Sequence, residues 1–128
     1  MEAEMKRISI ALSTLLAASN VALGQTCDPG PKCSASAKAM SAIVKDQLSK
    51  AETPDAGAAA LARYCVSKAT SLVAKDCADE FSTTGNSQCV SKAMAESDNN
   101  AASATAYLEE SNKVLGENAA DDFAATCR

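Results

Sequence analysis

The chain has 128 residues, a formal net charge of -4, six cysteines and no histidine. The acidic charge balance, with only two tyrosines and two phenylalanines, argues against nucleic-acid binding, which uses basic patches and aromatic stacking. Without imidazole, a Ser-His-Asp triad, a Cys-His pair and zinc sites that contain histidine are excluded. We therefore expect a protein that is not an enzyme and that uses no cofactor or metal ion.

The first 24 residues have the pattern of a signal peptide. Lys6 and Arg7 supply a positive start, an apolar run follows from Ile8 to Leu16, and small residues lead up to Gly24. The apolar run is shorter than the about 20 residues that a membrane-spanning helix needs. We therefore predict cleavage after Gly24, a secreted protein, and a single cysteine-rich domain over residues 25–128.

The mature chain has few large apolar side chains. After Gly24 it contains 13 Leu, Ile, Val and Phe residues against 23 alanines. Alanine has the highest helix propensity and strand-forming residues are sparse, so we predict an all-α fold, a small disulfide-stapled bundle of four to five helices. Because so small a core supplies little burial energy, we expect disulfides to contribute much of the stability.

The first two helices have recognisable limits in the sequence. Apolar residues recur at three- and four-residue spacing over residues 33–50, which predicts the first helix. Thr53, Pro54 and Asp55 are typical of a helix start, with Thr53 as the capping side chain. The second helix then continues to the Thr-Thr-Gly segment at 83–85.

Polar residues divide the rest of the chain. Asn86 or Ser87 can cap a third helix, which we expect to loosen at Ser97–Asn100. A fourth helix is predicted over residues 101–115, and Gly116 is well placed to end it. A short terminal helix follows.

Six cysteines allow 15 different disulfide connectivities. Cys65 and Cys77 lie on one predicted helix, about 18 Å apart at 1.5 Å per residue, so a bond between them is excluded. Folding the first two helices about Glu52 places Cys33 near Ser71, which lies between Cys65 and Cys77 in the sequence. Cys77 and Cys89 flank the turn at residues 83–86 and could join the helices on either side of it. We therefore favour these pairs: Cys33 with Cys65, Cys77 with Cys89, and Cys27 with Cys127.

Six side chains are candidates for an apolar ligand or partner surface. Methionines tolerate varied ligand shapes, and a bundle with small side chains inside can enclose an apolar cavity. The alternative is that these side chains are simply the core. A homodimer that buries Tyr107, Leu108 or Phe81 would also complete a thin core. The six candidates are Met40, Tyr64, Leu72, Phe81, Met94 and Tyr107.

Calcium binding is a further alternative. Residues 98–100, Asp-Asn-Asn, supply the oxygen ligands that calcium prefers, although the segment lacks the closing glutamate of an EF-hand loop. This alternative predicts calcium-dependent association with a membrane.

In general style the chain resembles the small secreted cysteine-rich effector proteins of fungi and oomycetes. The resemblance rests on the leader of residues 5–24, the six cysteines, the composition rich in Ala, Ser and Lys, and the lack of His and Trp. Elicitins are similar in size, cysteine number and helicity, and that similarity implies sterol carriage. The intervals between the cysteines are 5, 31, 11, 11 and 37 residues, which differ from the spacing in elicitins.

These observations lead to a functional expectation. We expect a secreted, non-enzymatic effector or virulence-type protein that binds a host or competitor component, either a protein or part of a membrane. The alternative is an extracellular carrier of a lipid or sterol.

Overall fold

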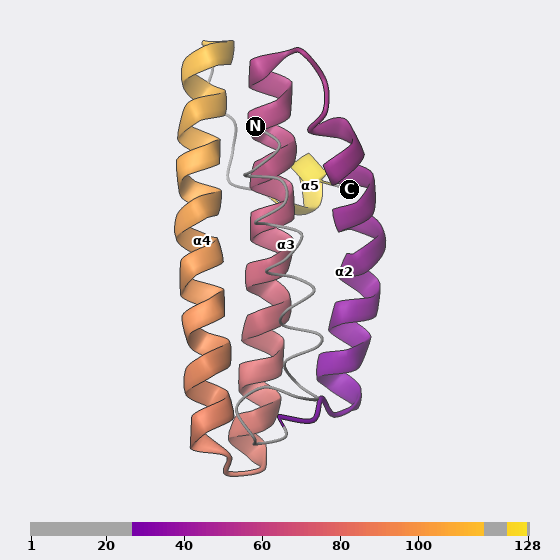
Figure 1. The fold of residues 1–128 in the computed structure, drawn as a ribbon, viewed down its shortest axis with the longest axis vertical. Helices are drawn as coiled ribbons and strands as arrows, with labels where there is room; N and C mark the ends of the chain where they lie inside the picture. The colour runs from indigo at the N-terminus through magenta and orange to yellow at the C-terminus, as the bar shows by residue number, and fades with distance from the viewer. Residues whose placement is uncertain (1–26, 117–122, 128) are drawn as a thin grey trace.

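A computed structural model of the chain describes residues 27–116 and 123–127. They form helices α2 (Pro31–Lys50), α3 (Ala56–Thr83), α4 (Ser87–Leu115) and α5 (Phe123–Cys127). The three long helices are antiparallel neighbours with α3 in the middle, and the short α5 packs against α3 (Figure 1). The predicted all-α class is confirmed. The predicted bundle of four to five helices is wrong, because the described residues form a three-helix bundle stapled by three disulfides.

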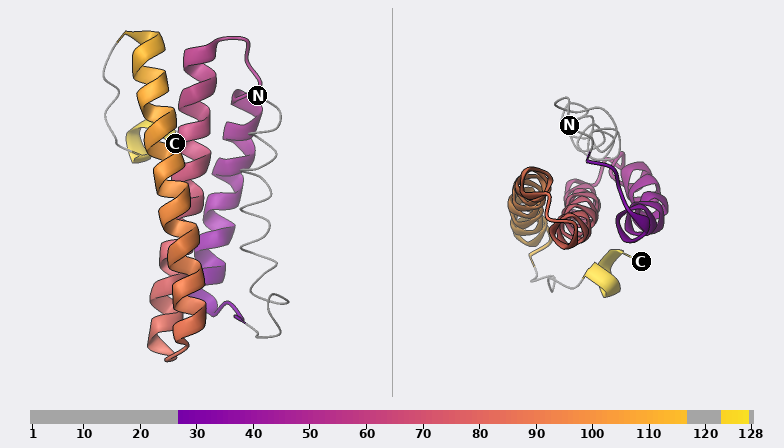
Figure 2. Two further views of the ribbon diagram at one scale, coloured as in Figure 1. Left: turned by 60° about the vertical axis from the view of Figure 1, so that its left-hand side comes forward. Right: turned by 90° about the horizontal axis from the view of Figure 1, so that it is seen from below.

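Seen end-on, the three long helices lie roughly in a row, with α5 to one side of it (Figure 2). No helix in the described ranges is long and apolar enough to cross a membrane. This arrangement gives α3 a neighbour on each flank, so α3 has the largest number of buried residues.

The start of α2 is capped by a side chain from α3. Gly30, the N-cap residue, makes no side-chain hydrogen bond. Instead, the Glu80 carboxylate accepts hydrogen bonds from the backbone N–H groups of Lys32 at 2.8 Å and Cys33 at 3.1 Å. A Cβ atom on residue 30 would lie 2.5 Å from Glu80 Oε1, so glycine leaves room for this contact. The negative carboxylate also complements the positive end of the helix dipole.

The other helix limits follow local capping rules. Asp55, rather than the predicted Thr53, caps α3, and its side chain accepts from the N–H groups of Gly57 and Ala58. Asn86 caps α4, and Gly116 ends it in the left-handed conformation with φ at 71°. Asn86 is one of the two capping residues that the sequence offered, the other being Ser87, and the prediction that Gly116 ends a helix is confirmed.

Helix α4 runs without interruption through residues 97–100, so the predicted break there is wrong. Ser97 and Asn100 are both buried within the helix instead of forming a turn. Ser71 Oγ donates to the carbonyl of Ser97 at 2.9 Å, and Ser97 Oγ donates to the carbonyl of Ser71 at 3.0 Å. The Asn100 amide donates to the Glu96 carbonyl one turn earlier at 2.8 Å. These bonds satisfy the polar groups within a continuous helix.

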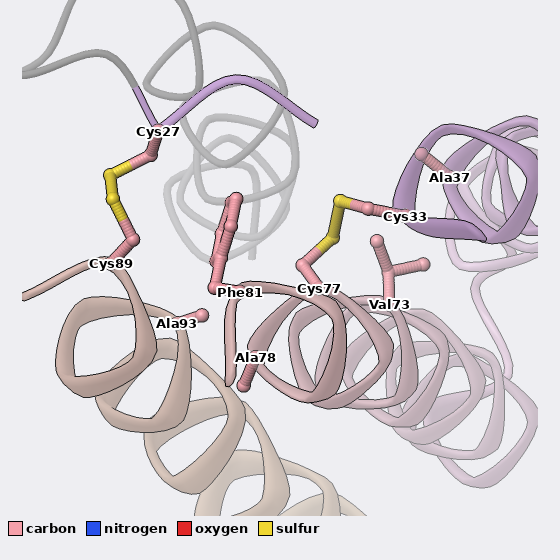
Figure 3. Packing of buried hydrophobic residues seen from close by; sticks show 9 residues of the cluster. All are labelled: Cys27, Cys33, Ala37, Val73, Cys77, Ala78, Phe81, Cys89 and Ala93. Carbon is pink, nitrogen blue, oxygen red and sulfur yellow. A yellow bond between two sulfur atoms is a disulfide. The ribbon is translucent and has the colours of Figure 1, made fainter. Parts of the chain in front are cut away.

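The core consists of two clusters at different levels of α3. Of the 13 large apolar residues counted in the sequence, five are buried. The Phe81 cluster contains Cys27, Cys33, Ala37, Val73, Cys77, Ala78, Phe81, Cys89 and Ala93. The Tyr64 cluster contains Val44, Tyr64, Cys65, Val66, Ala69, Ala104, Phe123 and Cys127. In Figure 3 the Phe81 ring lies between the Cys27–Cys89 and Cys33–Cys77 disulfides.

All six cysteines are paired, but the favoured connectivity is wrong. The disulfides join Cys27 to Cys89, Cys33 to Cys77 and Cys65 to Cys127. The chain turns between α2 and α3 at residues 51–55, and Cys33 lies opposite Cys77, six residues further along α3 than the expected Ser71. Cys77 therefore bonds to α2 and cannot pair with Cys89. The exclusion of a bond between Cys65 and Cys77 is confirmed.

Candidate functional site

The six predicted surface residues do not converge on one site. Tyr64 is buried in the Tyr64 cluster, and Met40, Leu72 and Tyr107 pack against the same cluster while partly buried. Phe81 is buried in the other cluster, although Met40 also contacts that one. Met94 is 38% exposed on α4 and belongs to neither cluster. Most of these side chains therefore contribute to the core.

The predicted calcium segment is part of α4. Asp98 and Asn99 are exposed, whereas Asn100 is buried and bonded to the Glu96 carbonyl. In the described part of the chain, no cluster of three or more His, Cys, Asp or Glu residues is arranged to hold a metal ion.

Helix α3 has identifiable neighbours on three of its sides. The Cys33–Cys77 disulfide marks the side that faces α2. The hydrogen bonds between Ser71 and Ser97 mark the side that faces α4. The Cys65–Cys127 disulfide marks the side that faces α5.

The fourth side of α3 is lined by residues at three-, four- and seven-residue spacing. At 3.6 residues per turn, Arg63 and Cys65 point to nearly opposite sides of the helix, so the side that carries Arg63 faces away from α5. The same side carries four further residues, and we call the set the α3 stripe. All five are buried in the structure of residues 1–128, between 0% and 7% exposed. The α3 stripe consists of Arg63, Ser67, Thr70, Ala74 and Phe81.

Arg63 is the unusual member of the α3 stripe. Its side chain is 3% exposed, and its Nε and Nη2 atoms have no hydrogen-bond partner among the described residues. The buried hydroxyls of Ser67 and Ser111 also lack a partner in these ranges. A buried charge without a partner is unfavourable by several kcal/mol, because it has lost its hydration without gaining an ion pair.

The packing of α3 against α4 brings Ser111 to the same half of α3 as Arg63. Ser71 pairs with Ser97 at one level. Nearer the start of α3, a Cβ on Gly57 would lie 2.6 Å from a Leu115 methyl group. Gly57 of α3 and Leu115 of α4 are therefore a second pair of neighbouring positions on the two antiparallel helices. Ser111 lies between those levels on α4.

Arg63 was not among the residues that the sequence singled out. Two signals could have indicated it: it is one of only two arginines after Gly24, and it stands among alanines in a segment with few polar residues. Arg63 also lies 18 residues, or five helical turns, before Phe81. Ser67, Thr70 and Ala74 lie between them at helical spacing, so all five residues are on one side of the helix. What the sequence does not reveal is that the other three sides have neighbours.

The fold and its crosslinks define a class: a small all-α, cysteine-rich three-helix bundle whose three disulfides indicate an oxidising environment. The chain matches no family model, no curated protein and no solved structure at a significant level. The predicted signal peptide lies outside the described residues.

Proposed function

We propose that the protein is a secreted, non-enzymatic effector that acts by binding a component of a host or a competitor. The observation that carries this proposal is the use of all six cysteines as structural crosslinks. Such crosslinks suit a small protein that functions outside the cell, where a thin core alone would give low stability.

Gene deletion tests this proposal. The deletion strain should show reduced virulence or reduced fitness in mixed culture, and the wild-type gene should restore the phenotype. A gene that carries Cys33→Ser and Cys77→Ser should restore it poorly, whereas a Ser41→Ala gene, altered at an exposed position on α2, should restore it fully. An unchanged phenotype across hosts and competitors would contradict the proposal.

A second candidate function, extracellular carriage of a lipid, is favoured by the α3 stripe. This side of α3 combines buried small side chains and Phe81 with a guanidinium whose Nε and Nη2 have no hydrogen-bond partner among the described residues. Apolar surface with a few polar groups that fix orientation is typical of small-molecule sites. Native mass spectrometry of the secreted protein after incubation with a lipid extract should detect a stoichiometric ligand if the protein is a carrier.

A further inference from the structure

We propose that the exposed face of α2 docks the protein electrostatically on the surface of an anionic lipid bilayer. This inference rests on the proposed effector function and names the chemistry of the component that is bound. We call the surface the α2 basic face. It consists of Lys32, Lys38, Lys45 and Lys50.

The α2 basic face points away from the rest of the bundle. Cys33 is bonded to Cys77 of α3, and Val44 is buried on the same inner side of α2. At 3.6 residues per turn, Ala35 and Ala42 lie on the opposite side of the helix, and the four lysines flank these small residues. All four lysines are exposed in the structure of residues 1–128, and removal of any residue can only increase their exposure. The face is therefore accessible with or without the leader.

This face is positively charged although the whole chain is acidic. Helix α2 contains four lysines and one aspartate, a formal charge of +3, whereas the chain has a net charge of -4. The aspartate, Asp46, forms an ion pair with Lys50, with 3.0 Å between Nζ and Oδ2. In the described part of the chain, the other three lysines of the face have no ion-pair partner. Three ammonium groups are therefore available to an anionic surface.

Negative charge is concentrated at the other edge of the bundle. Helices α2 and α4 are the outer members of the row (Figure 2), and α4 contains four acidic residues and two lysines. Packed helix axes are about 8–10 Å apart, so the axes of α2 and α4 are separated by about 16–20 Å. This separation is about twice the Debye length of about 8 Å at physiological ionic strength. The acidic residues of α4 are therefore largely screened from a surface that contacts α2.

Binding through this face uses charge rather than insertion of apolar side chains. Among the described residues, the exposed large apolar side chains are Met94, Val114 and Leu115, and all three belong to α4. A lysine close to an anionic bilayer strengthens binding by about fivefold. The α2 basic face is therefore suited to lie on the headgroups without entering the hydrocarbon layer.

A bilayer fits the α2 basic face better than a second copy of the chain does. The outer side of α4 is the acidic surface that a second copy offers, but Lys113 is exposed there beside Glu109 and Glu110. Exposed ion pairs between proteins contribute little, because each one must hold two long side chains in one geometry. A bilayer presents negative headgroups along the entire face, which extends about 27 Å from Lys32 to Lys50 at 1.5 Å per residue.

The test measures co-sedimentation of the processed, disulfide-bonded protein with vesicles. Wild type should bind vesicles of phosphatidylserine and phosphatidylcholine in equal parts and should not bind vesicles of phosphatidylcholine alone. Raising the salt concentration from about 0.1 M to about 1 M shortens the Debye length from about 10 Å to about 3 Å and should release the protein.

Two pairs of substitutions separate the α2 basic face from the net charge. Lys38→Gln combined with Lys45→Gln should weaken binding to the mixed vesicles by about 25-fold, which is about fivefold for each lysine. Lys75→Gln combined with Lys113→Gln removes the same charge from exposed positions on α3 and α4. Because those positions lie outside the contact, this control pair should bind within about twofold of wild type.

A third variant should strengthen binding. Asp46→Asn removes the negative charge of the face and frees Lys50, so it should bind the mixed vesicles about fivefold more tightly than wild type. Circular dichroism and thermal unfolding report whether the variants fold. All of them should unfold close to the temperature of wild type, because every substituted position is exposed.

Three results would overturn the proposal: no binding of wild type to the mixed vesicles, equal binding to phosphatidylcholine alone, or an equal loss in the two paired variants. Wild-type assemblies that Lys38→Gln with Lys45→Gln disperses, together with no vesicle binding, would instead assign the α2 basic face to a second copy of the chain. A deletion phenotype that persists while vesicle binding fails would reject this inference and leave the effector proposal standing. Vesicle binding without a deletion phenotype would reject the effector proposal and support the assignment of the surface.

Discussion

The two core clusters stabilise α3 by different means. In the Phe81 cluster four of the nine buried residues are cysteines, and Phe81 is the single aromatic residue. The Tyr64 cluster has one disulfide among its eight buried residues. It also includes Tyr64 and Phe123 and is surrounded by partly buried apolar side chains such as Leu61 and Leu72. Crosslinks are therefore most frequent where large apolar side chains are fewest.

This contrast indicates that the two clusters should respond differently to substitution. A disulfide acts largely by restricting the unfolded chain, whereas a buried aromatic side chain acts through burial and packing in the folded state. The four predictions below test whether the division of roles between the clusters is real.

The largest effect is expected at the Phe81 cluster. Replacing Cys33 and Cys77 together with serine removes a crosslink between residues separated by 44 positions. The loop-closure entropy corresponds to about 4 kcal/mol of unfolding free energy, which urea denaturation should detect as a lower midpoint. A loss below about 1 kcal/mol would show that packing alone holds α2 to α3. Wild type treated with a reductant is the control for the other two bonds.

At the Tyr64 cluster, the main effect should come from an apolar side chain. Tyr64 is 1% exposed, and Tyr64→Ala should lower the free energy of unfolding by about 3 kcal/mol with all three disulfides intact. Denaturation under non-reducing conditions gives the value. Met94→Ala, at an exposed position on α4, is the control and should change the stability by less than about 0.5 kcal/mol. Equal losses in the two variants would contradict the division of roles.

A smaller effect is expected between the clusters, where α3 and α4 share a pair of buried serines. Ser71→Ala removes the donor to the Ser97 carbonyl and one partner of the Ser97 hydroxyl, which should cost about 1–2 kcal/mol. The Ser71→Ala, Ser97→Ala double variant should lose less than the sum of the two single losses, because each single variant already removes the 3.2 Å contact between the two hydroxyls. Additive losses in this double-mutant cycle would show that the hydroxyls act independently.

The smallest effect concerns the tertiary cap of α2. Glu80→Ala removes the acceptor for Lys32 N–H and Cys33 N–H and should cost about 1 kcal/mol, whereas Glu80→Gln should cost less because it keeps an acceptor oxygen. Gly30→Ala should have an effect similar to that of Glu80→Ala, since its methyl group would displace the carboxylate. Thermal unfolding of the three variants provides the ranking. If Gly30→Ala raised the stability, the close contact would be unimportant.

Local sequence signals predicted the helices well but not how they pack together. Asn86 and Gly116 were identified correctly because capping depends on adjacent residues and on backbone conformation. The predicted break at Ser97–Asn100 was wrong for a reason that lies elsewhere in the chain. Ser71, on another helix, provides the hydrogen bonds that let Ser97 be buried. A polar segment resembles a turn when its partner is not known.

Neither the disulfide pairing nor the α3 stripe could be predicted from the sequence, and the reason is the same for both. The way α2 is set against α3 by the connection at residues 51–55 decides whether Cys33 lies opposite Cys77 or Ser71. Arg63 stands out only once the neighbours of α3 are known on its other three sides. Both depend on how helices are placed around each other, which helical periodicity does not determine.

The order of the disulfide-bonded cysteines affects how readily proteases degrade the protein. The bonds Cys27–Cys89, Cys33–Cys77 and Cys65–Cys127 overlap along the chain. Wherever the backbone is cut once between Cys27 and Cys127, at least one bond still joins the two pieces. A first cleavage, for example after Lys50 at the exposed end of α2, therefore releases no fragment. The nicked molecule keeps its parts together, so degradation requires several cuts or reduction of the disulfides.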